Sequence, residues 1–192
     1  MILMENTALP EYRLIRSRRR TISVEIAEDA GVIVRAPKWL PLYEINAYVA
    51  KNADWIREHA EKIKRSNNRA LALGKFSRNE IEALHTMAVA TIPEKVQYYA
   101  QILGVTYGRI TIRNQKTLWG SCNAKGNLSF NCLLMKAPEH VRNYVIVHEL
   151  CHRMEMNHSK AFWAHVATVI PDYGKCRKWL RDEGSLLLRM MP

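Results

Sequence analysis

One segment in the last third of the chain constrains the fold more than any other. The chain has helical character from Pro138 to an expected helix end at Met154-Glu155, but apolar side chains occupy almost every side of this helix up to Leu150. Pro138 is well placed as its first residue, because the proline ring presets a helical φ. A helix that is apolar all round has no face to turn to water. The rest of the domain must therefore enclose this segment.

The same segment leads into His148-Glu149-Leu150-Cys151-His152, which has the form H-E-x-x-H. Four residues advance a helix by slightly more than one turn, so His148 and His152 project from one face and can bind one Zn²⁺ ion. Glu149 lies beside them, where it can act as general base toward an attacking water. An apolar helix cannot bury these three side chains cheaply unless they are paired or bind a metal. We therefore predict His148 and His152 as zinc ligands and Glu149 as the catalytic residue.

A catalytic zinc site has three protein ligands and one open position. We predict His158 as the third ligand, because it lies in the short connection between the end of this helix and the next helix. The other candidates for this position are His165, Glu155, Asp172 and Glu183.

In the first 68 residues, apolar side chains recur at a different spacing. Apolar and polar positions alternate over residues 12–36, which predicts a three-stranded β-meander with a turn at 28–31. Apolar residues then recur at helical spacing from Leu42 to Ile63, and the polar stretch 64–69 is the predicted linker. We expect an N-terminal domain over 1–68 and a second domain over 75–192, which could also pack as one unit.

The second half is expected to place a small antiparallel sheet beside the buried helix, giving an α+β fold. Ser77 and Glu80 have the spacing of a capping box, which opens a helical pattern that runs to Gly104. Pro93 interrupts the pattern, so the sequence is compatible with either one kinked helix or two consecutive helices. The remaining expected elements are strands at 109–113, 118–121 and 128–131, the last two as a hairpin, and helices at about 157–170 and 173–187. Phe162 and Trp163 are expected to be helix-packing residues.

The chain carries 29 Lys and Arg against 18 Asp and Glu, a net charge of +11. Such an excess raises the question of a polyanionic partner. One basic cluster stands out, and we expect it to be a solvated turn, with nucleic-acid binding as the alternative. Its members are Arg13, Arg16, Arg18, Arg19 and Arg20. No apolar run is long enough to span a membrane and the N-terminus has no signal-type apolar region, so a cytoplasmic protein without a membrane partner is expected.

Several segments together resemble the YgjP-like metallopeptidase domain family, over nearly the whole chain. They are Thr117–Cys122 (TLWGSC), Gly126–Asn131 (GNLSFN), Tyr144–His152 (YVIVHELCH), Asn157–Ser159 (NHS) and the pair Phe162-Trp163. The resemblance implies a zincin-like catalytic half, in which His148, His152 and His158 match the three histidines of the family. Relatives often carry Arg where this chain has Leu118. A substrate contact by that arginine therefore cannot be carried over.

Three functions are compatible with these residues. The first is a zinc metallopeptidase, in which an extended peptide pairs with the edge of the strand at 128–131. The second is a nucleotide pyrophosphatase, because the resemblance extends to relatives that hydrolyse UTP and a basic surface suits a triphosphate. The third is a nucleic-acid-associated zinc module, but Glu149 argues against it because a structural zinc site needs no general base. Tyr173, Arg153 and His165 are candidates for stabilising the transition state.

Overall fold

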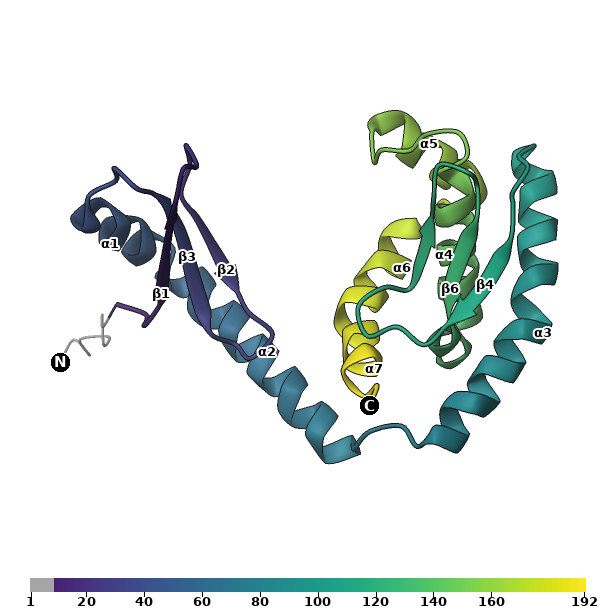
Figure 1. Cartoon of the computed structure of the whole chain (residues 1–192), viewed down its shortest axis with the longest axis horizontal. Coiled ribbons are helices and arrows are strands. Elements are labelled where there is room, and N and C mark those ends of the chain that lie inside the picture. The colour runs from purple at the N-terminus through teal and green to yellow at the C-terminus, as the bar shows by residue number, and fades with distance from the viewer. Residues whose placement is uncertain (1–8) are drawn as a thin grey trace. The chain divides into compact units, whose positions relative to one another are not determined.

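The computed structural model describes residues 9–192. The chain divides into two compact units, one ending at Arg69 and the other covering residues 70–192 (Figure 1). Each unit has its own three-stranded sheet, its own helices and its own apolar core. The fold class is α+β, as the sequence predicts.

The N-terminal unit is a small sheet with two helices packed against it. Its strands are β1 (Arg13–Ser17), β2 (Ser23–Ile26) and β3 (Val32–Pro37), and its helices are α1 (Leu42–Lys51) and α2 (Ala53–Leu73). The core joins Val34 and Ala36 of the sheet to Ile45 and Val49 of α1 and Ile56 of α2. The alternation seen in the sequence is therefore the alternation between this core and the opposite sheet face.

The predicted meander is wrong in its strand order. The order is β1-β3-β2, with β3 antiparallel to β2 and parallel to β1. Alternation fixes which face a strand turns to the core but not which strands are neighbours. β3 is the most apolar and most buried of the three strands, and the central place gives both of its edges a partner.

The predicted linker at 64–69 is helical, because α2 continues through it to Leu73. Its Lys and Arg residues are good helix formers on a solvated surface, where Lys64 pairs with Glu61 one turn earlier. Asn67 also donates its side-chain N–H to the backbone carbonyl of Glu28, at 2.8 Å. The helix ends at Gly74, whose φ of +79° suits glycine.

In the second unit, α3 (Arg78–Leu103) is one helix that includes Pro93. The Ser77–Glu80 capping box is present at its start, and Gly104 ends it in the left-handed conformation. The buried residues of α3 keep a single face on both sides of the proline, so packing favours a continuous helix over two separate ones. They are Ile81, Leu84, Ala88, Ile92, Val96 and Ala100.

The second sheet contains β4 (Ile110–Arg113), β5 (Gly120–Cys122) and β6 (Leu128–Asn131), in the order β4-β6-β5. The β5–β6 hairpin is antiparallel as predicted, but β4 pairs with β6 in parallel. The sheet is therefore mixed, because the long connection between β4 and β5 lets the chain cross over before the hairpin begins. Both edges of β6 are occupied, and β5 lies at an edge of the sheet.

The apolar segment forms α4 (Glu139–Cys151) and is buried as predicted, with Val141, Ile146 and Leu150 fully inaccessible. α4 lies behind the sheet, between α3 and α6, and packs against β5 (Figure 1). The other elements of this unit are η1 (Cys132–Lys136), α5 (Lys160–Val169), α6 (Tyr173–Trp179), the π-helical η2 (Leu180–Gly184) and α7 (Ser185–Arg189). Within residues 9–192, no helix has the length and apolarity needed to cross a membrane.

Candidate metal centre

The last two turns of α4 present His148 and His152 on the same side of the helix. Their ring centroids are 5.0 Å apart, as the spacing of four residues requires. The helix that carries them is held by the core of the unit, since Val147 before them and Leu150 and Cys151 between them are fully buried. The two histidines therefore start from a rigid element, which is what a preorganised metal site needs.

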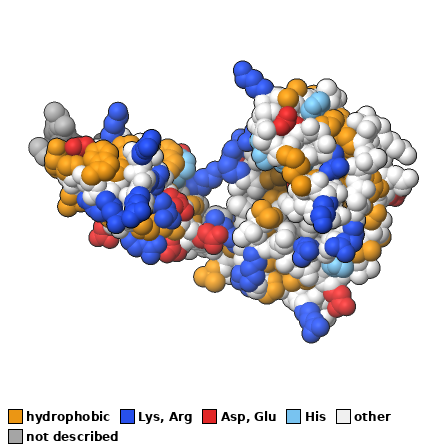
Figure 2. Space-filling model, turned by 45° about the horizontal axis from the view of Figure 1, so that its top comes forward, with side chains coloured by type: hydrophobic (Ala, Val, Ile, Leu, Met, Phe, Trp, Pro, Cys, Tyr) orange, Lys and Arg blue, Asp and Glu red, His pale blue; other side chains and the backbone are white. Residues whose placement is uncertain are grey.

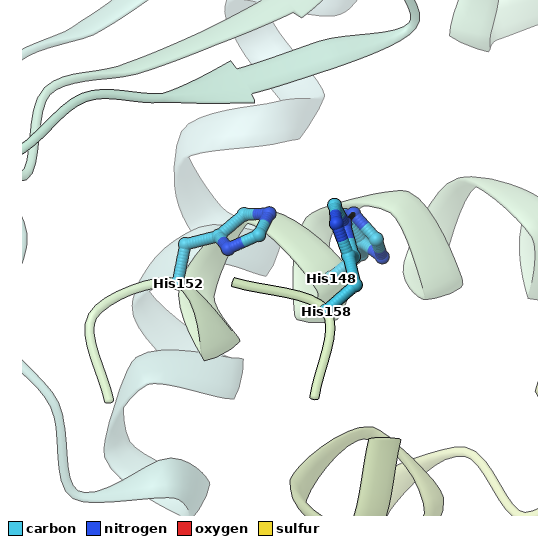
Figure 3. Close-up of side chains that lie close together, drawn as sticks. All are labelled: His148, His152 and His158. Carbon is cyan, nitrogen blue, oxygen red and sulfur yellow. Dashed lines mark hydrogen bonds between the residues drawn. The ribbon is translucent and has the colours of Figure 1, made fainter. Parts of the chain in front are cut away.

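His158 reaches the same point from the turn that follows α4. The amides of Met154 and Glu155 both donate to the carbonyl of Cys151 at 3.0 Å, which closes the end of the helix and turns the chain back. Ser159 then caps α5, by accepting from the amide of Phe162 at 3.3 Å. Figure 3 shows the ring of His158 beside the ring of His148, with the ring of His152 directed toward both.

The nitrogen atoms of the three rings fit a single metal ion. The Nε2 atoms of His148 and His158 are 3.1 Å apart, and one nitrogen from each of the three rings lies within 4.8 Å of the others. Two imidazole nitrogens bound at the usual distance from a tetrahedral zinc ion lie about 3.4 Å apart. Three imidazoles also form the donor set of a common catalytic zinc site. The His148, His152 and His158 cluster is therefore a possible metal site.

Backbone and side-chain contacts orient two of these rings. Nδ1 of His152 lies 3.1 Å from the backbone carbonyl of Glu155, so the ring N–H donates there and Nε2 keeps its lone pair. Nδ1 of His148 lies 3.4 Å from the hydroxyl of Tyr144, and with its proton on Nδ1 this ring also leaves Nε2 free. Such outer contacts select the ring tautomer that can bind a metal.

Burial keeps His148 neutral. Burial first, with smaller electrostatic effects of His152, His158 and Arg177, lowers the pKa of His148 to about 3. Burial also lowers the pKa of His152. A neutral imidazole is the form that binds a metal, so burial favours the metal-binding form of His148 and His152.

The carboxyl group of Glu149 is enclosed between α4 and β5. Only 6% of this residue is exposed, and its carboxyl group has no hydrogen-bond partner among the described residues. Burial raises the pKa of Glu149 to about 8. A Cβ atom added at Gly120 would lie 2.7 Å from the Oε1 atom of Glu149. The absence of a side chain at Gly120 therefore allows β5 to approach the Glu149 carboxyl group closely. A buried carboxyl group without a hydrogen-bond partner is energetically costly, which marks Glu149 as a candidate functional residue beside the histidine cluster.

The other candidates for a third ligand do not join the cluster. Of the residues that the structure describes, His165, Asp172 and Glu183 are not part of any group placed to share a metal with His148 and His152. Glu155 contributes only its backbone carbonyl to His152. Of the five candidates, His158 alone is brought to the pair.

The sequence analysis did not predict that aromatic rings pack against the histidine cluster. The ring of Phe162 lies 4.6 to 4.9 Å from all three histidine rings. Trp163 stacks on His158 at 5.7 Å and on Tyr173 at 5.1 Å, and the guanidinium of Arg177 lies 4.5 Å from the Trp163 ring. Phe162 is a buried packing residue as predicted, but both aromatics also contact the histidines. His158 precedes α5, so helical spacing within the sequence could not have predicted its contact with Phe162.

Two of the three transition-state candidates have other roles in the structure. Arg153 donates its Nε to the backbone carbonyl of Thr106 at 3.0 Å, and its guanidinium lies where a Cβ on Gly126 would be. It therefore ties the β5–β6 hairpin to the end of α4. Only the backbone carbonyl of His165 has an assigned contact, from Thr168, and among the described residues its ring is not part of the histidine cluster. Tyr173, through Trp163, is the candidate that the structure connects to the cluster.

Comparison with known proteins agrees with this arrangement. No curated protein matches the chain at a significant level. One solved structure, the crystal structure of the metallopeptidase zymogen of Pyrococcus abyssi abylysin, is 23% identical and has a TM-score of 0.45. The match covers 53% of this chain and 100% of that one. The profile of the family described as YgjP-like, metallopeptidase domain matches residues 20–86 and 75–183. The chain therefore belongs to the YgjP-like metallopeptidase domain family.

Proposed function

We propose that this protein is a zinc-dependent metallopeptidase, with His148, His152 and His158 as the metal ligands and Glu149 as the general base. One observation carries the proposal. Three convergent imidazoles lie next to a buried, unpartnered carboxyl group, and a strand at the edge of a sheet lies against that carboxyl group. The membership of the chain in a metallopeptidase domain family supports a peptide as the substrate.

A zinc ion held by the three histidines would supply a Lewis acid that lowers the pKa of a water molecule toward 7 and polarises the scissile carbonyl. Glu149 would accept the proton of the attacking water and give it to the departing nitrogen. Its enclosed position favours this role, because burial raises the pKa of the carboxyl and so lets it hold a proton between the two transfers.

The strand geometry supports an extended substrate along β5. The amide of Asn131 donates to the carbonyl of Trp119 at 2.9 Å, and hydrogen-bonded pairs alternate along an antiparallel ladder. Gly120 and Cys122 therefore turn their amides and carbonyls away from β6, where an added strand could pair with them. This corrects the sequence-based expectation of pairing at 128–131, because β6 is the central strand.

One observation favours a nucleotide pyrophosphatase as the second candidate. The guanidinium of Arg177 lies over Trp163 beside the cluster, and its charge acts on His148. A fixed cation beside a metal suits the phosphate groups of a nucleoside triphosphate. The same base and the same ligands would serve attack at phosphorus.

The test is to incubate the zinc-loaded protein with casein, a peptide library and a panel of nucleoside triphosphates, and to follow new α-amino groups and released pyrophosphate separately. Glu149→Gln is the matched control, because it keeps the shape of the side chain but cannot accept the proton. We expect peptide cleavage that falls about 100-fold or more in the variant. Hydrolysis of nucleotides without peptide cleavage would replace the first proposal by the second.

A further inference from the structure

The N-terminal unit gathers two loops at one end of its sheet. β1 runs parallel to β3, so the carboxyl ends of both strands lie side by side, with Ser17 opposite Pro37. The amide of Lys38 donates to the carbonyl of Ser17 at 3.1 Å. The loop at 18–22 and the loop at 38–41 are therefore neighbours, although twenty residues separate them in the sequence. A meander would have left β2 between the two strands and so kept these loops one strand further apart.

Arg16 fixes the second of these loops. Its Nη1 atom lies 3.1 Å from the carbonyl oxygens of Pro37 and Lys38 and 2.7 Å from that of Leu40. Three carbonyl dipoles thus converge on one guanidinium nitrogen, which holds the loop in a single shape. The side chain of Trp39, between these carbonyls, is presented by an ordered turn.

Large aromatic side chains are left in solvent at this point. Trp39 and Tyr43 are each 71% exposed, and Leu42 between them is 54% exposed. Tyr43 lies in the first turn of α1, and its hydroxyl donates to Glu44 at 3.2 Å. Single exposed apolar residues are ordinary, but contiguous ones that include Trp and Tyr mark binding surfaces.

Basic side chains border the aromatic ones. Arg18 and Arg20 are exposed on the first loop and Lys38 is exposed on the second. Within the described part of the chain, none of the three lies within ion-pair distance of an acidic group. Figure 2 shows Lys and Arg side chains next to hydrophobic ones on the visible face of the N-terminal unit. We call Arg18, Arg20, Lys38, Trp39 and Tyr43 the aromatic-basic surface.

We propose that the aromatic-basic surface binds single-stranded nucleic acid. The unpaired cations would contact the phosphates, while Trp39 and Tyr43 would stack on bases, which only an unpaired strand exposes. The contacts are to phosphate and base faces and not to the sugar, so DNA and RNA strands form one ligand class. The sequence analysis interpreted the basic cluster as a solvated turn. The parallel pairing of β1 and β3 brings Arg18 and Arg20 of this cluster close to Trp39, which is why we assign them a part in binding.

The test measures binding of the full chain to a fluorescently labelled strand of twenty thymidines, by anisotropy at 50 and 200 mM salt. One variant combines Trp39→Ala with Tyr43→Ala, and a second combines Arg18→Ser, Arg20→Ser and Lys38→Ser. The charge control combines Lys51→Ser, Lys64→Ser and Arg65→Ser, which removes the same charge from exposed positions of α1 and α2. The aromatic control is Trp55→Ala, whose ring stacks on His59. Circular dichroism checks that every variant folds.

We expect the aromatic variant to bind about 10-fold more weakly or worse at both salt concentrations. The basic variant should bind more weakly and with a salt slope smaller by about two, because about 0.7 counterions are released per phosphate contact of a single strand. The two controls should change the affinity less than about threefold. Three results would overturn the proposal: no binding by the wild type at 50 mM salt, equal losses in the controls, or equally tight binding of a duplex of the same length. Binding to phosphatidylserine vesicles without binding to the strand would also overturn it and make the surface a membrane contact.

Discussion

His158 is the metal-ligand candidate whose position owes least to regular secondary structure. It is exposed and lies in the turn between α4 and α5, whereas the other two histidines lie at the end of a buried helix. Its place depends on the helix-end turn at Cys151 and on the Ser159 cap. The identity of the third ligand is therefore the part of the proposed site that most needs a direct test.

We expect His158→Ala to weaken zinc binding about 100-fold or more, because two imidazoles alone leave a zinc site incomplete. His165→Ala is the matched control on α5 and should leave the affinity unchanged. Competition with a chromophoric chelator measures both. Full zinc affinity in His158→Ala would contradict the assignment and return Glu183 or Asp172 to consideration.

Trp163 is expected to keep His158 in place, since its ring stacks on the His158 imidazole and is itself held by Tyr173 and Arg177. Trp163→Ala should weaken zinc binding about 10-fold, in the range typical of residues that orient ligands. Trp163→Phe should restore most of the affinity, because a ring is retained. Equal zinc affinity in wild type and Trp163→Ala, with the fold checked by circular dichroism, would show that the turn alone positions His158.

At the residue scale, the sequence predicted what one helix or one short turn determines. The spacing of His148 and His152 follows from helical geometry, and Glu149 adjoins them in the chain. The stacking of Trp163 on His158 and Tyr173 depends on how α5 and α6 meet, which no local pattern contains. The unpartnered state of Glu149 likewise follows from the approach of β5, which is a tertiary feature.

At the scale of elements, helices were predicted better than sheets. The faces of α3 and α4 and the caps at Ser77, Gly104 and Ser159 are encoded within each element, so they could be predicted. Strand neighbours are not encoded in this way. Both sheets place the last strand in the centre, and both contain one parallel pair. Alternating hydrophobicity is equally compatible with the meander and with the observed order.

The close approach of β5 to α4 gives a prediction at this scale. In Gly120→Ala, the new methyl group would lie 2.7 Å from Glu149 Oε1 and 2.8 Å from its Cγ, so the Glu149 side chain must move. We expect zinc binding to persist, because no metal-ligand candidate is touched, while the catalytic rate constant falls about 10-fold or more, as for a displaced catalytic group. Gly174→Ala is the control, since no atom lies within 4 Å of its added Cβ. An unchanged rate in Gly120→Ala would argue that the position of Glu149 is not critical.

At the scale of the whole molecule, the two units hold the two proposed activities. The metal-site candidates and Glu149 lie in residues 70–192, while the aromatic-basic surface lies in the unit that ends at Arg69. The helical state of residues 64–69 could not be predicted, because a polar helical surface and a polar linker have the same composition. α2 ends only before Gly74, which lies between the apolar residues 71–73 and the basic Lys75.

The division predicts that residues 70–192 fold and bind zinc without the N-terminal unit. The larger apolar core is built only from residues between Phe76 and Met191, and Lys75 and Phe76 bond to backbone carbonyls near the C-terminus. A fragment of residues 70–192 should therefore unfold cooperatively with heat and bind one zinc ion with the affinity of the full chain. It should fail to bind the thymidine strand, because the aromatic-basic surface is absent. A fragment without a cooperative transition would show that residues 70–192 need the first 69 residues to fold. A fragment that binds the strand would locate nucleic-acid binding outside the aromatic-basic surface.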